Sequence, residues 1–253
     1  MNKILKFTLI GFCWIVIWYI GSLIIDLPLL FPPPNAVFSR LGTLLQTESF
    51  YKIALASFVR ILFGIVLAVG IGSLLAFISA IFKPFYDFLT PLIVVIKSTP
   101  VVAFVFLVNM IIGNGNTVIF ICFLMVFPII YSNVYQGIKS TDKDLLEMCK
   151  VYKLPLGKRI TGLYLPSIAP YFVSSLLSSI GLAWKAGVAA EILCTPTISI
   201  GYEIFNAKTY IEFVDLFAWV ITVVILSLIF ELIATSSLNR LMKSKKLSKG
   251  ANL

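Results

Sequence analysis

The sequence predicts an all-α membrane protein that crosses the bilayer six times. Of its 253 residues, 60% are hydrophobic and 12% are charged, and the mean hydropathy is +1.03. Soluble domains have about 25% charged residues, so a water-soluble core could not bury this much apolar surface. The apolar residues form continuous runs rather than short alternating strands, which indicates helices and not a barrel. We therefore expect one helical transmembrane domain over residues 1–253.

Six apolar runs are long enough to cross a bilayer, because one crossing takes about 20 helical residues. The first run has no small-residue cleavage site, which favours an anchor over a signal peptide. The three prolines at 32–34 predict that the chain then leaves the membrane, and Asn35 is expected to cap a short surface helix that ends near Leu45. The expected spans are 4–25, 56–82, 88–112, 118–135, 168–193 and 216–233.

The basic residues predict that both termini are cytoplasmic. The net charge is +9, and six spans with an internal amino terminus place most basic residues in the cytoplasm. Only Arg40, Lys52 and Lys208 fall in external segments, which is the bias of the positive-inside rule. A nucleic-acid binder would need its basic residues on a soluble face within a recognisable module. None is present, so no nucleic-acid partner is expected.

Residues for catalysis, metal binding or nucleotide binding are missing from the sequence. It contains no histidine, which removes the usual metal-ligand and triad motifs. Cys13, Cys122, Cys149 and Cys194 are far apart and form no CxxC pair. The glycine-rich segment 113–116 lacks the phosphate-binding pattern GxxxxGK and is expected to be a tight turn. We expect a non-catalytic chain without a cofactor of its own.

The loop between the fourth and fifth spans, residues 139–166, is the only long cytoplasmic segment expected. Its apolar residues recur at helical spacing beside charged ones, which predicts a short amphipathic helix capped by Thr141 or Asp142. Such a stripe needs a partner surface, which could be this chain's own helix ends or another protein. The residues of the stripe are Leu145, Leu146, Cys149 and Tyr152.

This loop resembles the signature of permease subunits of binding-protein-dependent ABC importers. That signature reads E-A-A, three residues, G, nine residues, I, any residue, L-P, and Glu147, Leu165 and Pro166 match it without a gap. Lys153 replaces the glycine, which argues against a sharp glycine turn because a non-glycine residue with positive φ costs on the order of 1 kcal/mol. The other replacements are Met148 and Cys149 for the alanines and Leu163 for the isoleucine.

Other stretches resemble the nitrate, sulfonate and taurine branch of that family. Residues 31–37, F-P-P-P-N-A-V, are similar to its L-P-x-P-x-x-V motif. Residues 181–191, G-L-A-W-K-A-G-V-A-A-E, are similar to its G-L-A-W-x-x-x-V-A-A-E motif, and Gly201-Tyr202 to the G-Y that follows. The resemblance covers nearly the whole chain.

The resemblance implies a type I importer permease fold in the bacterial cytoplasmic membrane. It implies a dimer with a second copy of the chain, a separate ABC ATPase dimer that binds ATP and Mg, and an extracytoplasmic binding protein that delivers the substrate. The loop would contact the ATPase, and Pro155 and Pro166 would stiffen it. The expected contact residues are Leu145, Leu146, Glu147, Met148, Cys149, Tyr152, Lys153, Leu154 and Pro155.

Ionisable residues at membrane depth usually face a partner or a water-filled path. Lys97 and Lys185 could instead snorkel from near helix ends. Glu191 lies six residues after Lys185, a spacing that does not bring the two side chains together. The small residues of the fifth span suit close packing, and the resemblance makes this span a wall of the pathway. The candidate residues for the pathway, from the third and fifth spans, are Lys97, Ser178, Trp184, Lys185 and Glu191.

The two lysines favour an anionic substrate. The resemblance implies an alkanesulfonate or taurine, with a vitamin-like compound or a thiamine-precursor pyrimidine as the alternative. An ion-coupled secondary transporter is a competing class, but such proteins generally show inverted repeats or broken helices with midplane carboxylates. The sequence shows no clear internal repeat. A membrane-embedded enzyme is disfavoured by the lack of a nucleophile-base constellation.

Overall fold

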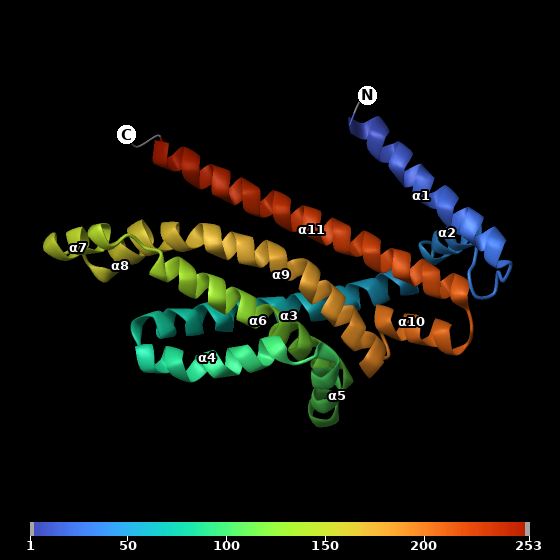
Figure 1. Cartoon of the computed structure of the whole chain (residues 1–253), viewed down its shortest axis with the longest axis horizontal. Coiled ribbons are helices and arrows are strands. Elements are labelled where there is room, and N and C mark those ends of the chain that lie inside the picture. The colour runs from blue at the N-terminus through green and yellow to red at the C-terminus, as the bar shows by residue number, and fades with distance from the viewer. Residues whose placement is uncertain (1–2, 251–253) are drawn as a thin grey trace.

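The computed structural model describes residues 3–250, and every regular element in this range is a helix. Figure 1 shows an elongated molecule with α7 (Lys143–Val151) and α8 (Leu156–Arg159) at one end and α10 (Ile200–Thr209) towards the other. We call these the α7 end and the α10 end. The helices long and apolar enough to span a membrane are α1 (Lys3–Ile25), α3 (Glu48–Ile81), α6 (Asn114–Lys139), α9 (Leu165–Cys194) and α11 (Phe213–Gly250).

The expected span 88–112 is wrong as a continuous helix. It forms α4 (Lys83–Ser98) and α5 (Val101–Ile112), which meet at an angle of 106°. Thr99 has extended backbone angles, as the residue before a proline prefers, and Pro100 has no amide hydrogen to continue the helix. Counting the bent pair as one span gives six candidate spans.

Two local expectations for loop residues are also corrected. Helix α2 (Pro34–Leu44) begins two residues earlier than expected, with Pro33 at its N-cap position, so Asn35 is not the cap. A proline at the first helical position suits the fixed φ of its ring. Between α5 and α6 only Gly113 is non-helical, with φ of 79°, so the expected turn 113–116 is a single residue.

The core of the molecule is formed by α3, α6 and α9, which pack along one another (Figure 1). At Gly187 of α9 a Cβ atom would lie 2.6 Å from Ile61 of α3 and 2.9 Å from the sulfur of Cys122 in α6. The Cys122 thiol donates to the carbonyl of Ala183 at 3.6 Å. Small residues thus let the three backbones approach closely, as in other membrane helix bundles.

Helices α1 and α11 lie on the outside of this core. In the apolar window of α1 only 6% of the residues are buried, against 61% in that of α6. The Trp18 ring of α1 stacks on Phe217 of α11, with centroids 5.9 Å apart. Helix α2 is held to α11 by two hydrogen bonds, 2.6 and 2.7 Å long, from Arg40 to the Asp215 carboxylate. The exposed apolar side chains of α1 and α11 form a surface suited to lipid.

Candidate functional site

Helix α7 forms at the start of the loop that the sequence singles out. The Asp142 carboxylate accepts a hydrogen bond from the amide of Asp144 at 2.9 Å, so Asp142 rather than Thr141 is the cap. Two residues of the apolar stripe face the rest of the chain: Cys149 is buried and Leu146 is half-buried. Part of the stripe therefore packs on this chain's own structure.

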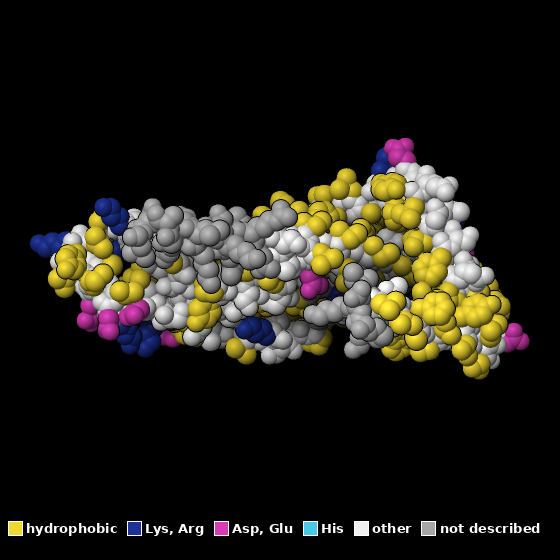
Figure 2. Space-filling model, turned by 90° about the horizontal axis from the view of Figure 1, so that it is seen from above, with side chains coloured by type: hydrophobic (Ala, Val, Ile, Leu, Met, Phe, Trp, Pro, Cys, Tyr) yellow, Lys and Arg dark blue, Asp and Glu magenta, His cyan; other side chains and the backbone are white. Residues whose placement is uncertain are grey.

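The opposite face of α7 is apolar and open. Leu145 and Met148 are exposed, Tyr152 is 72% exposed, and Val151, which the sequence analysis did not select, is 78% exposed. Glu147 is also exposed, on the charged side of the helix next to this face. Figure 2 shows apolar and charged side chains side by side at the α7 end. Nothing in the described part of the chain covers this face.

Helix α7 ends in a left-handed turn at Lys153. Its φ is 47°, the amide of Leu154 donates to the carbonyl of Cys149 at 3.0 Å, and the amide of Lys153 donates to the carbonyl of Lys150 at 3.0 Å. This pair of bonds is the Schellman motif, in which the left-handed position is usually glycine. The sharp turn that the lysine seemed to disfavour is therefore present, and the lysine adopts the strained conformation.

The loop then returns to the spans in a fixed conformation. Pro155 follows the turn, and the Arg159 guanidinium donates through Nε to the carbonyl of Leu154 at 2.7 Å. The structure thus places all nine residues predicted to contact an ATPase on one capped helix and its terminal turn. Their role in that contact stays a prediction.

Lys97 lies at the break of the third span. It is in the last turn of α4, is exposed, and its Nζ donates to the hydroxyl of Ser132 in α6 at 3.0 Å. Broken helices at membrane depth mark binding sites in many transporters. The third span of this chain is broken in this way between α4 and α5.

The pathway candidates on α9 divide between two faces. Ser178 and Lys185 are exposed and lie seven residues apart, which is two helical turns on one face. Trp184 is 1% exposed, and its indole nitrogen donates to the carbonyl of Val223 in α11 at 3.0 Å. Glu191 is fully buried. Trp184 and Glu191 therefore lie inside the helix packing and do not line an open surface.

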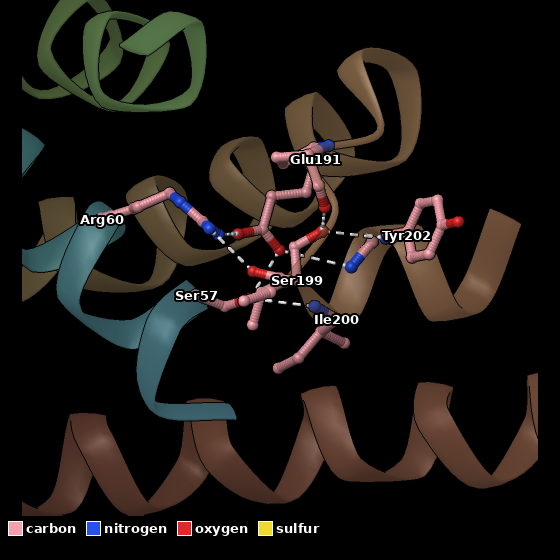
Figure 3. Close-up of polar contacts among 9 residues, drawn as sticks. Ser57, Arg60, Glu191, Ser199, Ile200 and Tyr202 are labelled. Atoms are coloured by element: carbon pink, nitrogen blue, oxygen red, sulfur yellow. Dashed lines mark hydrogen bonds and ion pairs between the residues drawn. The ribbon is translucent and has the colours of Figure 1, made fainter. Parts of the chain in front are cut away.

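Glu191 forms an ion pair with Arg60 near the α10 end (Figure 3). The Arg60 guanidinium donates to Oε1 of Glu191 at 2.9 Å and to the carbonyl of Ile198 at 2.7 Å. The hydroxyl of Ser57 donates to Oε2 of Glu191 at 2.7 Å. The sequence alone does not predict this partner, because Arg60 and Glu191 are 131 residues apart. The feature of the sequence that could have predicted this ion pair is the presence of two opposite charges within apolar spans.

The same carboxylate holds the start of α10. The amide of Gly201 donates to Oε2 of Glu191 at 3.2 Å, the amide of Ile200 donates to Ser57 Oγ at 2.9 Å, and Ser199 caps the amide of Tyr202 at 3.0 Å (Figure 3). A Cβ at Gly201 would lie 2.3 Å from that of Glu191, so only glycine fits here. We call Ser57, Arg60, Glu191, Ser199 and Gly201 the buried polar cluster.

These features agree with a comparison across protein families. Residues 68–245, more than half of the chain, match the family described as the binding-protein-dependent transport system inner membrane component. The chain belongs to this family. It is the permease subunit of an ABC importer and a multi-pass cell membrane protein, as predicted. In such importers an ATPase and a substrate-binding protein work with the permease.

Individual relatives fall in the predicted branch. The chain is 23% identical over 229 residues to the taurine transport system permease protein TauC of Escherichia coli, covering 85% of this chain and 80% of the relative. It is 34% identical over 155 residues to the nitrate import permease protein NrtB of Synechococcus elongatus, covering 60% and 55%. A crystal structure of a bacterial ABC transporter that imports alginate shares the fold, with a TM-score of 0.62 at 17% identity over 94% of this chain and 95% of that one.

Proposed function

We propose that two copies of this chain enclose the pathway of an importer driven by a separate ATPase dimer. The observation that carries this proposal is the exposed apolar face of α7. A capped helix that exposes Leu145, Met148 and Tyr152 on a face beside the exposed Glu147 is suited to a protein partner rather than to water. The loop lies outside the apolar cores of the expected spans, so its partner is a soluble one. ATP and Mg would bind to that partner.

The proposal places the α7 end and both termini in the cytoplasm. We call residues 142–159 the α7 loop. This orientation is supported by its basic residues, among them Lys143, Lys150 and Lys158. The α10 end then faces the extracytoplasmic binding protein. A homodimer about a two-fold axis is the simplest way for one such bundle to enclose a path. One permease chain per two ATPase chains would contradict it.

The substrate we propose is a small organic anion such as an alkanesulfonate, or taurine, which carries an anionic sulfonate beside its ammonium group. Lys97, Ser178 and Lys185 would line the path, because they are polar, exposed and carried by α4 and α9. Ammonium groups on a path attract anions. Trp184 and Glu191 would instead support this wall from behind. A vitamin-like compound or a thiamine-precursor pyrimidine is the alternative cargo.

Uptake by proteoliposomes tests this proposal. The permease would be reconstituted with the ATPase and binding protein encoded beside it, and entry of radiolabelled taurine and ethanesulfonate would be measured with and without internal ATP. We expect uptake only with ATP, and Lys185→Gln should lower it while Lys52→Gln, an exposed lysine of α3, should not. Uptake driven by a proton or sodium gradient without ATP would contradict the proposal. ATP-driven uptake of a pyrimidine but of neither anion would contradict the anion assignment alone.

A further inference from the structure

The backbone hydrogen bonds change from the α-helical to the π-helical pattern where the α7 loop joins α9. Residues Ile160–Tyr164 form a π-helical turn, η1, in which the amide of Leu165 donates to the carbonyl of Ile160, five residues back. Pro166 accounts for this widening, because its ring would collide with the carbonyl of Gly162 in an α-helical register. Single π turns inside longer helices are common at functional positions.

The structure on either side of η1 is held more firmly. On one side, the Asp142 cap, the Schellman bonds and the Arg159 contact with Leu154 join residues 142–159 into one unit. On the other side, α9 runs as a single helix from Leu165 to Cys194. Bending of the backbone between these two units should require the least free energy at the π turn, because helices kink at such turns.

A cavity of about 330 Å³ lies beside this turn. This volume is partly open to the outside of the helix bundle, so side chains that line it can move without separating the core helices. The hydroxyl of Ser73 is buried at its wall without a hydrogen-bond partner. The cavity is lined by Ser73 and Phe77 of α3, Val134 of α6, Ile160 and Tyr164 of η1, and Leu165, Ile168, Ala169 and Phe172 of α9.

We propose that η1 is a hinge between the α7 loop and α9. When the ATPase moves, residues 142–159 turn as one body about Ile160–Tyr164, and the side chains of Ile160 and Tyr164 move into the cavity. The hinge then converts a movement of the loop into a change in the tilt of α9, which carries Ser178 and Lys185. This inference rests on the proposed function only in that an ATPase supplies the movement.

Filling the cavity tests the hinge. Ala169→Phe places a large side chain in the space that Ile160 and Tyr164 need. The matched control is Leu67→Trp, which fills a second apolar cavity of about 320 Å³ between α3, α5 and α6. We expect both variants to assemble with the ATPase, and Ala169→Phe to lose about tenfold in ATP-driven uptake while the control loses less than about twofold. Equal uptake by both variants would overturn the proposal.

Hydrogen exchange on the unaltered complex gives an independent test. Amide exchange would be followed by mass spectrometry in the nucleotide-free and the ATP-and-vanadate-trapped states. The hinge predicts about a tenfold change in exchange rate within 156–168 and little change within 172–190 of α9. Unchanged exchange in 156–168 of a complex that shows ATP-driven uptake would overturn the hinge alone. A complex without ATP-driven uptake would instead remove the proposed function.

Discussion

The buried polar cluster and the α7 loop show two opposite ways of placing polar groups near a membrane. In the cluster Glu191 is fully buried, and Arg60, Ser57 and the amide of Gly201 all bond to its carboxylate. In the loop, apolar side chains such as Tyr152 are exposed and Lys153 has a strained backbone. The cluster forms its polar contacts within one chain, whereas the loop leaves apolar side chains that the described part of the chain does not cover.

The difference indicates which region serves the fold and which serves an interaction. The ion pair is supported by hydrogen bonds from Ser57 and the amide of Gly201 to Glu191, and the cluster joins α3, α9 and the start of α10. An exposed apolar face and local backbone strain contribute nothing to the stability of the chain alone. Substitutions in the cluster should therefore mainly lower the stability of the chain. Substitutions in the loop should mainly weaken binding of the proposed ATPase.

The largest effect should come from breaking the ion pair. Arg60→Leu leaves the Glu191 carboxylate buried without its charged partner, and such a change costs about 3 kcal/mol or more. Thermal unfolding in detergent would show a lower Tm. The control is Lys52→Leu, since the Lys52–Glu48 pair is exposed and its loss should cost about 0.5 kcal/mol or less. Equal losses for the two variants would remove the distinction between the regions.

A smaller effect of opposite sign is expected in the loop. Lys153→Gly places glycine at the left-handed position of the Schellman turn and should raise stability by up to about 1 kcal/mol. Lys153→Ala is the matched control, because alanine removes the charge but keeps the strain. Chemical denaturation would compare the two variants. If alanine stabilised as much as glycine, the strain would not be the cause.

The smallest effect concerns pH at the α10 end. Burial, and then the charge of Asp215, raise the pKa of Glu203 in α10. A carboxyl whose pKa is higher in the folded state stabilises the fold below its unfolded pKa, and this contribution is lost as the pH rises through the folded pKa. Glu203→Gln should therefore flatten the fall in Tm as the pH rises from about 4. An identical pH profile for the two proteins would contradict this assignment.

Sequence patterns identified the helices of this fold well because length and apolarity determine them. The break at Pro100 was missed because proline alone does not decide the outcome: Pro91 and Pro128 remain inside α4 and α6. A proline can stay in a membrane helix where neighbouring groups compensate for the lost bond. Which proline ends a helix thus depends on tertiary packing.

The candidate site was predictable where its residues are close in the chain. The α7 loop follows from local spacing, and its cap, Asp142, is one of the two residues predicted for that position. The pairing of Arg60 with Glu191, and the burial of Trp184 against Val223, depend on how α3, α9 and α11 pack. Helical periodicity predicts which residues lie on the same face of a helix, but it does not predict which other helix packs against that face. For this reason the sequence alone predicts that Trp184 and Glu191 line the pathway together with Lys185, whereas Trp184 and Glu191 are buried and Lys185 is exposed.

In the proposed importer the exposed face of the α7 loop binds the ATPase. The most direct test is to measure the affinity of the ATPase for the Glu147→Arg permease in nanodiscs. Glu147 is exposed on α7, so the variant should fold with an unchanged Tm. Reversing a charge in the interface should weaken ATPase binding by about 2 kcal/mol or more, roughly thirtyfold, and uptake should fall with it. Lys52→Glu, a reversal near the α10 end, should leave binding unchanged. Normal ATPase affinity and uptake for Glu147→Arg would contradict the account.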